Sequence, residues 1–147
     1  MMTKLNVMIA GSTGYIGIQL IKLLTKHKNV NIKYLCGSKS AGKEISYYDK
    51  SLKINKLPKI IKFKKKLLAN VDLIFTALPN GESQKISNFL FPHNYLIDLS
   101  ADFRLNSVKE YSKWYKMNHR SSKNISKSIY AIPEFKKKMI KNYKIIA

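Results

Sequence analysis

The sequence has one cysteine, two arginines and only eight acidic residues among its 147 residues. The single cysteine, Cys36, excludes an internal disulfide and a zinc site built from cysteines, which suits a reducing compartment. No apolar run approaches the ~20 residues that a membrane-spanning helix needs, and residues 6–10 are too short for the apolar part of a signal peptide. We therefore expect one domain over residues 1–147, located in the cytoplasm and without a membrane partner.

The scarcity of acidic residues leaves a net charge of +20, which by itself indicates a polyanionic partner such as nucleic acid. However, Arg104 and Arg120 are the only arginines among the 28 basic residues, and nucleic-acid recognition relies on arginine for bidentate contacts. The lysine runs near 62–66 and 136–138 are of the kind that usually forms a solvated face. We expect no specific nucleic-acid partner, and a basic nucleic-acid-binding protein remains the alternative.

The apolar pattern alternates between strand-like and helix-like segments. Strands are expected at 4–10, 31–36, 71–77, 95–99 and 144–147, and helices at 14–27, 82–90, 107–117 and 134–141. The polar segment 37–57 is interpreted as a loop with a short edge strand. This alternation predicts an α/β fold, a Rossmann-like doubly wound and mainly parallel sheet with helices on both faces. Ligands bind such sheets at the carboxyl ends of the strands.

A glycine-rich turn, AGSTGYIG at 10–17, follows the first expected strand and opens the first expected helix. Its spacing, G-x-x-G-x-x-G, is a relative of the dinucleotide-binding fingerprint, in which backbone N–H groups at a helix N-terminus meet a pyrophosphate. The hydroxyl groups of Ser12 and Thr13 would be further donors. Glycines in a turn also occur for structural reasons alone. The expected cofactor-binding residues are Gly11, Ser12, Thr13, Gly14, Tyr15, Ile16 and Gly17.

The end of the second expected strand has no acidic residue to bond the ribose hydroxyls of NAD, since the next acid is Glu44. Instead, Lys39 stands between Ser38 and Ser40, a set that suits a ribose 2′-phosphate. The sequence therefore predicts NADP as the cofactor. The alternative is that Lys39 is one more solvated lysine.

Several segments, in this order, resemble the N-acetyl-gamma-glutamyl-phosphate reductase family. They are 11–17, 38–43, 72–83, LIDLSADFRL at 96–105, Trp114-Tyr115 with His119, and YAIPE at 130–134. LIDLSADFRL is the most specific of them. The resemblance implies NADP-dependent reduction of N-acetyl-glutamyl phosphate to N-acetylglutamate semialdehyde in arginine biosynthesis. It also implies a Rossmann-type domain joined to an α+β catalytic domain, in a full-length form that is a homo-oligomer.

The resemblance further implies roles for particular residues. The segment 11–17 would hold the pyrophosphate, Ser38, Lys39 and Ser40 the 2′-phosphate, and Ala77, Leu78 and Pro79 the nicotinamide side. The family commonly has arginine where Lys39 stands and histidine where Asn80 stands.

For the small-molecule acyl-phosphate substrate, the resemblance implies Arg104 and Ser100, because a guanidinium suits an anionic acyl phosphate. An ion pair of Arg104 with Asp98 or Asp102 is an equally good interpretation of the sequence.

The implied reaction uses a cysteine nucleophile and a histidine acid–base. The resemblance places both beyond Ala147, so we expect no catalytic residue, no metal site and no reductase turnover in this chain alone. Cys36, His27, His93 and His119 do not match the family's catalytic positions. Another acyl-phosphate reductase, such as aspartate-semialdehyde dehydrogenase or the lysine-biosynthesis relative, and a stand-alone nucleotide-binding module are the alternatives.

Overall fold

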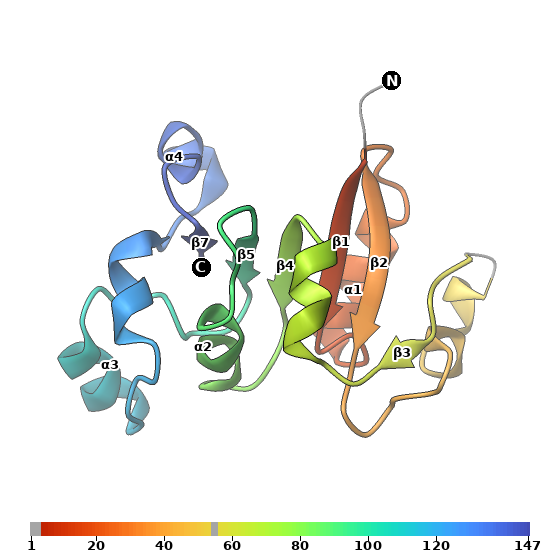
Figure 1. The fold of residues 1–147 in the computed structure, drawn as a ribbon, viewed down its shortest axis with the longest axis horizontal. Coiled ribbons are helices and arrows are strands. Elements are labelled where there is room, and N and C mark those ends of the chain that lie inside the picture. Colours follow the sequence, from red (N-terminus) through yellow and green to blue (C-terminus); the bar gives the residue numbers. More distant parts are fainter. Residues whose placement is uncertain (1–3, 54–55) are drawn as a thin grey trace.

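The computed structural model describes residues 4–53 and 56–147 and contains a sheet of seven parallel strands (Figure 1). The strand order is β3-β2-β1-β4-β5-β7-β6. The expected Rossmann-like doubly wound sheet is therefore confirmed. The strands are β1 (Leu5–Ala10), β2 (Val30–Cys36), β3 (Ile60–Ile61), β4 (Leu73–Thr76), β5 (Tyr95–Asp98), β6 (Ser128–Ile129) and β7 (Ile145–Ile146).

Within the described residues, four α-helices and four short 3₁₀ helices connect these strands. Helix α3 begins where the Ser107 hydroxyl accepts a hydrogen bond from the N–H of Glu110, and α4 begins with Pro133 in its first turn, where a missing N–H costs nothing. The helices are α1 (Tyr15–Leu24), α2 (Glu82–Ser87), α3 (Val108–Tyr115), α4 (Pro133–Ile140), η1 (Ile45–Tyr47), η2 (Lys50–Leu52), η3 (Lys65–Asn70) and η4 (Ser122–Lys127).

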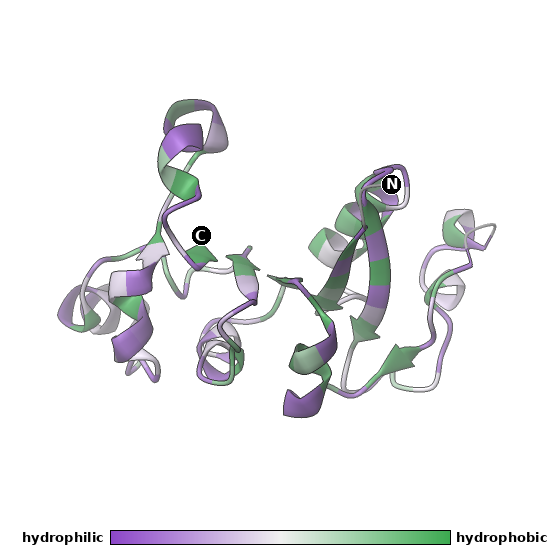
Figure 2. Cartoon of the chain, turned by 45° about the horizontal axis from the view of Figure 1, so that its top comes forward, coloured by the Kyte–Doolittle hydropathy of each residue, from purple (hydrophilic) through white to green (hydrophobic). Residues whose placement is uncertain are grey.

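Two hydrophobic cores lie on opposite faces of the sheet, and β1 contributes to both. Val7 and Ile9 pack on the face covered by α1, whereas Met8 and Ala10 pack on the face covered by η3 and α2. Figure 1 shows α1 behind the sheet and η3 in front of it, and Figure 2 shows hydrophobic residues along the central strands. Burial on both faces explains why β1 is an apolar run instead of an alternating one.

The chain crosses from one half of the sheet to the other between β1 and β4. From β1 it winds outward through α1 to β2 and β3, and after η3 it returns to β4 beside β1 and winds the other way through α2 to β5. A doubly wound sheet binds its ligands at such a switch point, outside the carboxyl ends of the strands. The fold therefore directs attention to the loops that follow β1 and β4.

Several boundaries differ from those expected. The short edge strand is β3, just beyond the segment 37–57, which itself contains η1 and η2; residues 54–55 of that segment lie outside the described residues. The helix expected at 82–90 ends at Ser87, because Phe89 and Leu90 donate to the carbonyls three residues earlier and form a tighter turn. The two-residue strand β6 has no counterpart among the expected elements.

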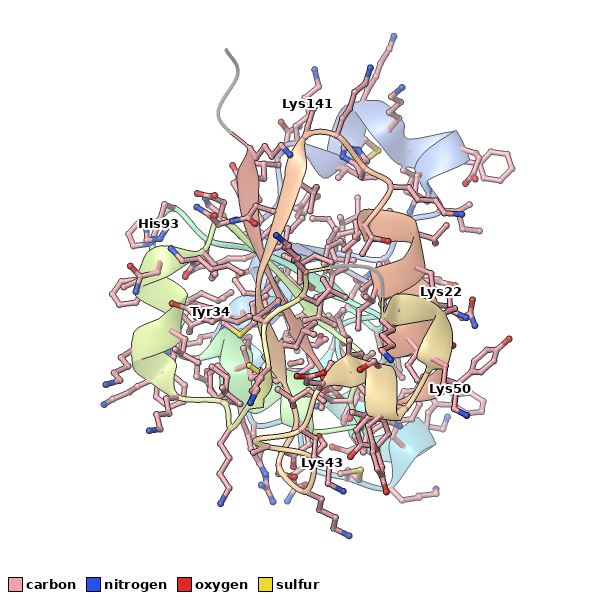
Figure 3. The ribbon with its side chains drawn as sticks, turned by 90° about the vertical axis from the view of Figure 1, so that its right-hand side faces the viewer. Lys22, Tyr34, Lys43, Lys50, His93 and Lys141 are labelled. Atoms are coloured by element: carbon pink, nitrogen blue, oxygen red, sulfur yellow. The ribbon has the colours of Figure 1, made fainter. Side chains whose placement is uncertain are left out.

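The lysines lie mainly on the outside of the molecule. Figure 3 shows the exposed Lys43, Lys50 and Lys141 at its periphery. Within the described ranges only two ion pairs form, one of them between Lys22 and Asp49 at 2.6 Å. Hydrogen bonds from Lys22 and Ser51 lower the pKa of Asp49 to about 2. None of the helices in these ranges has the length and apolar character that crossing a membrane requires.

Candidate functional site

The loop after β1 lies directly against the loop after β4. Gly11 has a φ of +85°, and a Cβ atom at this position would lie 2.1 Å from the carbonyl oxygen of Ala77. The N–H of Ala77 donates to the carbonyl of Ala10 at 2.8 Å, which extends the β1–β4 pairing into the loops. Only glycine fits here, for reasons of both backbone conformation and space.

The same loop is also attached to the end of β2. The N–H groups of Gly11 and Ser12 donate to the carbonyl of Cys36 at 3.0 and 3.2 Å, and the Ser12 hydroxyl donates to that oxygen at 3.2 Å. Ser12 is fully buried. Its hydroxyl therefore attaches the loop to the end of β2, while Thr13 is partly exposed.

The start of α1 presents several free N–H groups. Gly14 donates to Gly11, and a Cβ on Gly17 would lie 2.2 Å from the same carbonyl oxygen of Gly11, so the helix closes tightly on the loop. Among the described residues no acceptor meets the N–H groups of Thr13, Tyr15, Ile16 and Gly17. Free donors at a helix N-terminus are suited to an anion such as a pyrophosphate.

A cavity of about 360 Å³ adjoins this loop at the carboxyl ends of β1, β2 and β4. Ser38 lines it, whereas Lys39 is exposed and Ser40 is buried. The other lining residues are mostly apolar or glycine: Ala10, Gly11, Cys36, Gly37, Phe63, Leu78, Glu82, Lys85, Ile86 and Phe89. Of the residues expected on the nicotinamide side, Leu78 lines the cavity, Ala77 is partly buried and Pro79 is exposed.

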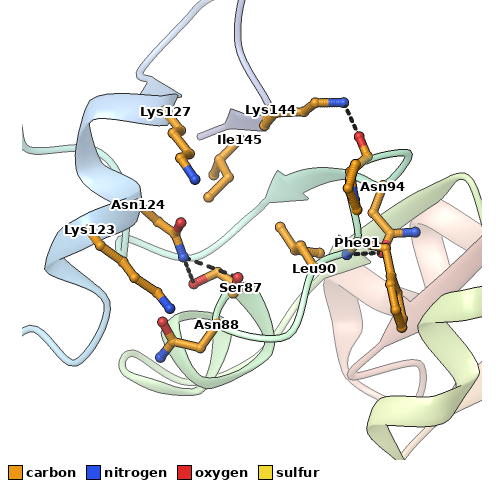
Figure 4. Close-up of a pocket in the computed structure, with 11 residues that line it drawn as sticks. Ser87, Asn88, Leu90, Phe91, Asn94, Lys123, Asn124, Lys127, Lys144 and Ile145 are labelled. Atoms are coloured by element: carbon orange, nitrogen blue, oxygen red, sulfur yellow. Dashed lines mark hydrogen bonds between the residues drawn. The ribbon is translucent and has the colours of Figure 1, made fainter.

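A second cavity, of about 480 Å³, lies at the opposite ends of the strands (Figure 4). It includes Asn94, which precedes β5, and Lys144, which precedes β7. The Lys144 ammonium donates to the carbonyl of Pro92 at 2.6 Å. The amino ends of parallel strands are not where doubly wound sheets bind nucleotides, and no glycine lines this cavity. It is therefore not the cofactor site.

The motif DLSADFR at 98–104 forms a buried polar turn, and Asp98 is its first anchor. The Asp98 carboxylate accepts hydrogen bonds from the Thr76 hydroxyl at 3.0 Å, the Ser100 hydroxyl at 2.6 Å and the N–H of Asp102 at 3.1 Å. Thr76 ends β4, so Asp98 joins the end of β4 to the loop after β5. The Ser100 hydroxyl is thereby committed to Asp98, and Ser100 is buried.

Asp102 is the second anchor, and sequence reasoning considered it only as a partner for Arg104. Its carboxylate accepts from the N–H of Gly81 at 2.7 Å, from the backbone and side-chain N–H groups of Gln84 at 3.2 and 3.0 Å, and from the Tyr111 hydroxyl at 2.8 Å. Burial, followed by the bond to Asp102, raises the pKa of Tyr111 far above its usual value. Two acids spaced four apart in an apolar stretch were the available signal for this buried pair.

Arg104 forms no ion pair with Asp98 or Asp102, so that interpretation of the sequence is wrong. Both carboxylates are buried and already hydrogen-bonded to neutral donors, whereas Arg104 is exposed. Arg104 lines a separate cavity of about 280 Å³ together with Tyr130 and Lys136. Its guanidinium is therefore available to an anionic ligand.

The cysteine and the histidines lie in different surroundings. Burial raises the pKa of Cys36 to about 12. His119 is buried, and its Nδ1 accepts from the N–H of Ser121, which leaves Nε2 to donate to the carbonyl of Asp102 at 2.9 Å. His27 and His93 are exposed. Across the described ranges no group of three or more histidine, cysteine, aspartate or glutamate side chains is arranged to hold a metal ion.

Comparison with known proteins gives a family match and similar curated sequences. Residues 6–143 match the family described as "Semialdehyde dehydrogenase, NAD binding domain". An N-acetyl-gamma-glutamyl-phosphate reductase of Brachyspira hyodysenteriae is 39% identical over 151 residues, covering 97% of this chain and 42% of that protein. The corresponding protein of Ehrlichia ruminantium is 37% identical over 148 residues, covering 98% of this chain and 42% of that protein. The chain thus spans less than half the length of these curated relatives.

Solved structures show the same fold at low sequence identity. Aspartate semialdehyde dehydrogenase II from Vibrio cholerae, complexed with ASA, has a TM-score of 0.61 at 16% identity, covering 99% of this chain and 41% of that chain. Aspartate semialdehyde dehydrogenase with NADP from Candida albicans has a TM-score of 0.58 at 18% identity, covering 98% of this chain and 42% of that chain.

Replacing Gly11 with alanine should destabilise the protein more than replacing Gly42. Both glycines have positive φ, which costs a substituted residue about 1–3 kcal/mol. A Cβ at Gly42 meets no atom within 4 Å, whereas one at Gly11 meets the backbone of Ala77, so G11A bears an additional steric cost. Urea unfolding of G11A and G42A measures the difference. Equal losses of unfolding free energy would contradict the proposed contact between the loops.

The Cys36 thiol should react slowly with Ellman's reagent at pH 8. A pKa of about 12 leaves very little thiolate, whereas an unfolded cysteine has a pKa of about 8.5, so the folded protein should react roughly 10³-fold more slowly than the urea-unfolded protein. The unfolded protein serves as the control. A folded-state rate close to the unfolded rate would show that the thiol is accessible and ionised.

Proposed function

The chain belongs to the semialdehyde dehydrogenase family, in which it corresponds to the NAD-binding domain, and from this premise we propose that it is the NADP-binding part of an N-acetyl-gamma-glutamyl-phosphate reductase. The proposed reaction is the NADPH-dependent reduction of N-acetyl-glutamyl phosphate to N-acetylglutamate semialdehyde. The identity of the curated relatives, at 31–39% over nearly the whole chain, supports this substrate over that of aspartate semialdehyde dehydrogenase.

One observation carries the cofactor proposal: the glycine loop leaves a row of free N–H groups at the switch point of the sheet. Gly11 brings this loop against β4, and Gly17 brings the first turn of α1 against the loop. The adjoining cavity extends toward the end of β2, where an adenosine would continue from the pyrophosphate. The residues present therefore fit a dinucleotide.

Selection of NADP is assigned to Ser38, Lys39 and Ser40. Ser38 lines the cavity and Lys39 is exposed beside it, so that a ribose 2′-phosphate there would meet a cation. Glu82, the acid that lines the same cavity, is paired with Lys85. Ser40 is buried, with its hydroxyl close to Gly37, and it shapes the turn that holds Lys39. These three residues would distinguish NADP from NAD by the negative charge of the 2′-phosphate.

When bound, the cofactor supplies the hydride for the reduction. The proposed tasks of this chain are to hold the pyrophosphate at residues 11–17 and to orient the nicotinamide beside Ala77, Leu78 and Pro79. Arg104, exposed and without an ion pair in the described part of the chain, is proposed to attract the acyl phosphate, while Ser100 shapes the turn on which Arg104 stands. The cytoplasm remains the expected compartment, and a homo-oligomer the expected assembly.

Replacing Lys39 with glutamate should weaken NADP binding about tenfold and leave NAD binding nearly unchanged, because only NADP carries the 2′-phosphate. The control, K141E, makes the same charge change at the exposed end of α4. Titration calorimetry with both cofactors measures the effect. Equal weakening of both cofactors, or NAD binding to the unaltered protein at least as tightly as NADP, would overturn the assignment.

The substrate is tested on the protein isolated from its source cells, in the phosphate-dependent oxidative direction. We expect kcat/KM for N-acetylglutamate semialdehyde to exceed that for aspartate semialdehyde by at least about a hundredfold, since the two differ in a polar group that the site must pair. A preference for aspartate semialdehyde would favour the alternative reductase. NADP binding without turnover of either aldehyde would favour a stand-alone nucleotide-binding module.

A further inference from the structure

The segment 78–81, which follows β4, is fixed at both of its ends. At its start, the N–H of Ala77 donates to Ala10 at 2.8 Å. At its end, the N–H of Gly81 donates to the Asp102 carboxylate at 2.7 Å. Between these two bonds Pro79 and Asn80 are exposed. The position of this exposed turn therefore depends on one backbone bond to β1 and one side-chain bond to Asp102.

The Asp102 carboxylate is surrounded by neutral donors. It is 0% exposed and receives four hydrogen bonds, three of them from Gly81 and Gln84 and one from Tyr111. Three of these bonds end on Oδ1 and one on Oδ2, and no part of the side chain is exposed to a ligand. Because every group facing it is a donor, an asparagine at this position would place its own NH₂ group against a donor. Only a carboxylate satisfies the whole arrangement.

The backbone of Asp102 is itself held by two further hydrogen bonds. Its N–H donates to Asp98 at 3.1 Å, and its carbonyl accepts from the ring of the buried His119 at 2.9 Å. The Gln84 side chain that donates to Asp102 also accepts from the N–H of Arg120 at 2.6 Å. Asp102 thus links the segment 78–81 to the buried residues Asp98 and His119.

We propose that Asp102 is a positioning residue for the nicotinamide half of the cofactor, acting through its hydrogen bonds to Gly81 and Gln84. This inference rests on the proposed function, in which the turn after β4 faces the nicotinamide. In the proposed function the adenosine half would lie toward the ends of β1 and β2, near Gly37 and Ser38, whereas the nicotinamide half would lie toward the turn after β4. Loss of the Asp102 carboxylate should therefore affect the two halves of the cofactor unequally.

The test compares NADPH with adenosine 2′,5′-bisphosphate, which lacks the nicotinamide, in binding to the chain with Asp102→Asn. We expect the Kd for NADPH to rise about tenfold and the Kd for the bisphosphate to change less than about twofold. The fluorescence of bound NADPH should also shift toward that of free NADPH, which reports the surroundings of the nicotinamide directly.

The matched control is Asn94→Ala. Asn94 is also 0% exposed, and its side chain makes three hydrogen bonds, to Leu68, Val71 and Phe91. It lies at the amino end of β5, away from the carboxyl ends of the strands. N94A should lower the unfolding midpoint, as D102N does, without changing the ratio of the two Kd values. A similar ratio in N94A and D102N would show that Asp102 acts only through global stability, and would overturn the proposal.

A milder variant, Tyr111→Phe, keeps the test decisive where D102N does not fold. It removes one donor from Asp102 and keeps the ring, so we expect a twofold to threefold weakening for NADPH alone. An unchanged NADPH affinity in Y111F, or in D102N where it folds, would overturn the positioning role. Failure of the unaltered chain to bind either ligand would instead overturn the proposed function itself.

Discussion

At Gly11 and Ala77 the backbones of two loops approach so closely that no side chain fits between them. A Cβ on Gly11 would lie 2.1 Å from the Ala77 carbonyl oxygen, so any larger residue would separate β1 from β4 at their carboxyl ends. These are the two strands between which the winding of the sheet reverses. Their separation would disturb the loop, the first turn of α1 that Gly17 packs onto it, and the adjoining cavity together.

Two carboxylates lie in the interior of this protein, whereas the lysines lie mainly on its surface. The interior turn around Asp98 and Asp102 contains two carboxylates whose hydrogen bonds come from backbone N–H, hydroxyl and amide groups, while the many lysines stay outside. Neutral donors allow a buried carboxylate to remain in place without a buried cation, which would add its own desolvation cost. Arg104 is thereby left exposed, consistent with the role proposed for it.

The sequence predicts well those features that are encoded locally. The parallel sheet, the glycine loop and helix α3 follow from periodicity and from glycine spacing. By contrast, β3 and β6 are two residues long and carry no periodic signal, so only their tertiary neighbours define them. The prediction of an ion pair for Arg104 was wrong. It considered only opposite charges close together in the sequence, whereas the fold brings N–H and hydroxyl donors to Asp98 and Asp102.

Two residues from other loops hold the turn after β4: Gly11 lies against its start, and Asp102 binds its end. Gly11 sets how close the turn comes to the loop after β1, because it removes the side chain that would hold them apart. Asp102 sets how the turn is oriented, because its hydrogen bonds to Gly81 and Gln84 fix the direction of the backbone. Both contacts are made within this chain, so the start and the end of the turn are held by different elements of the fold.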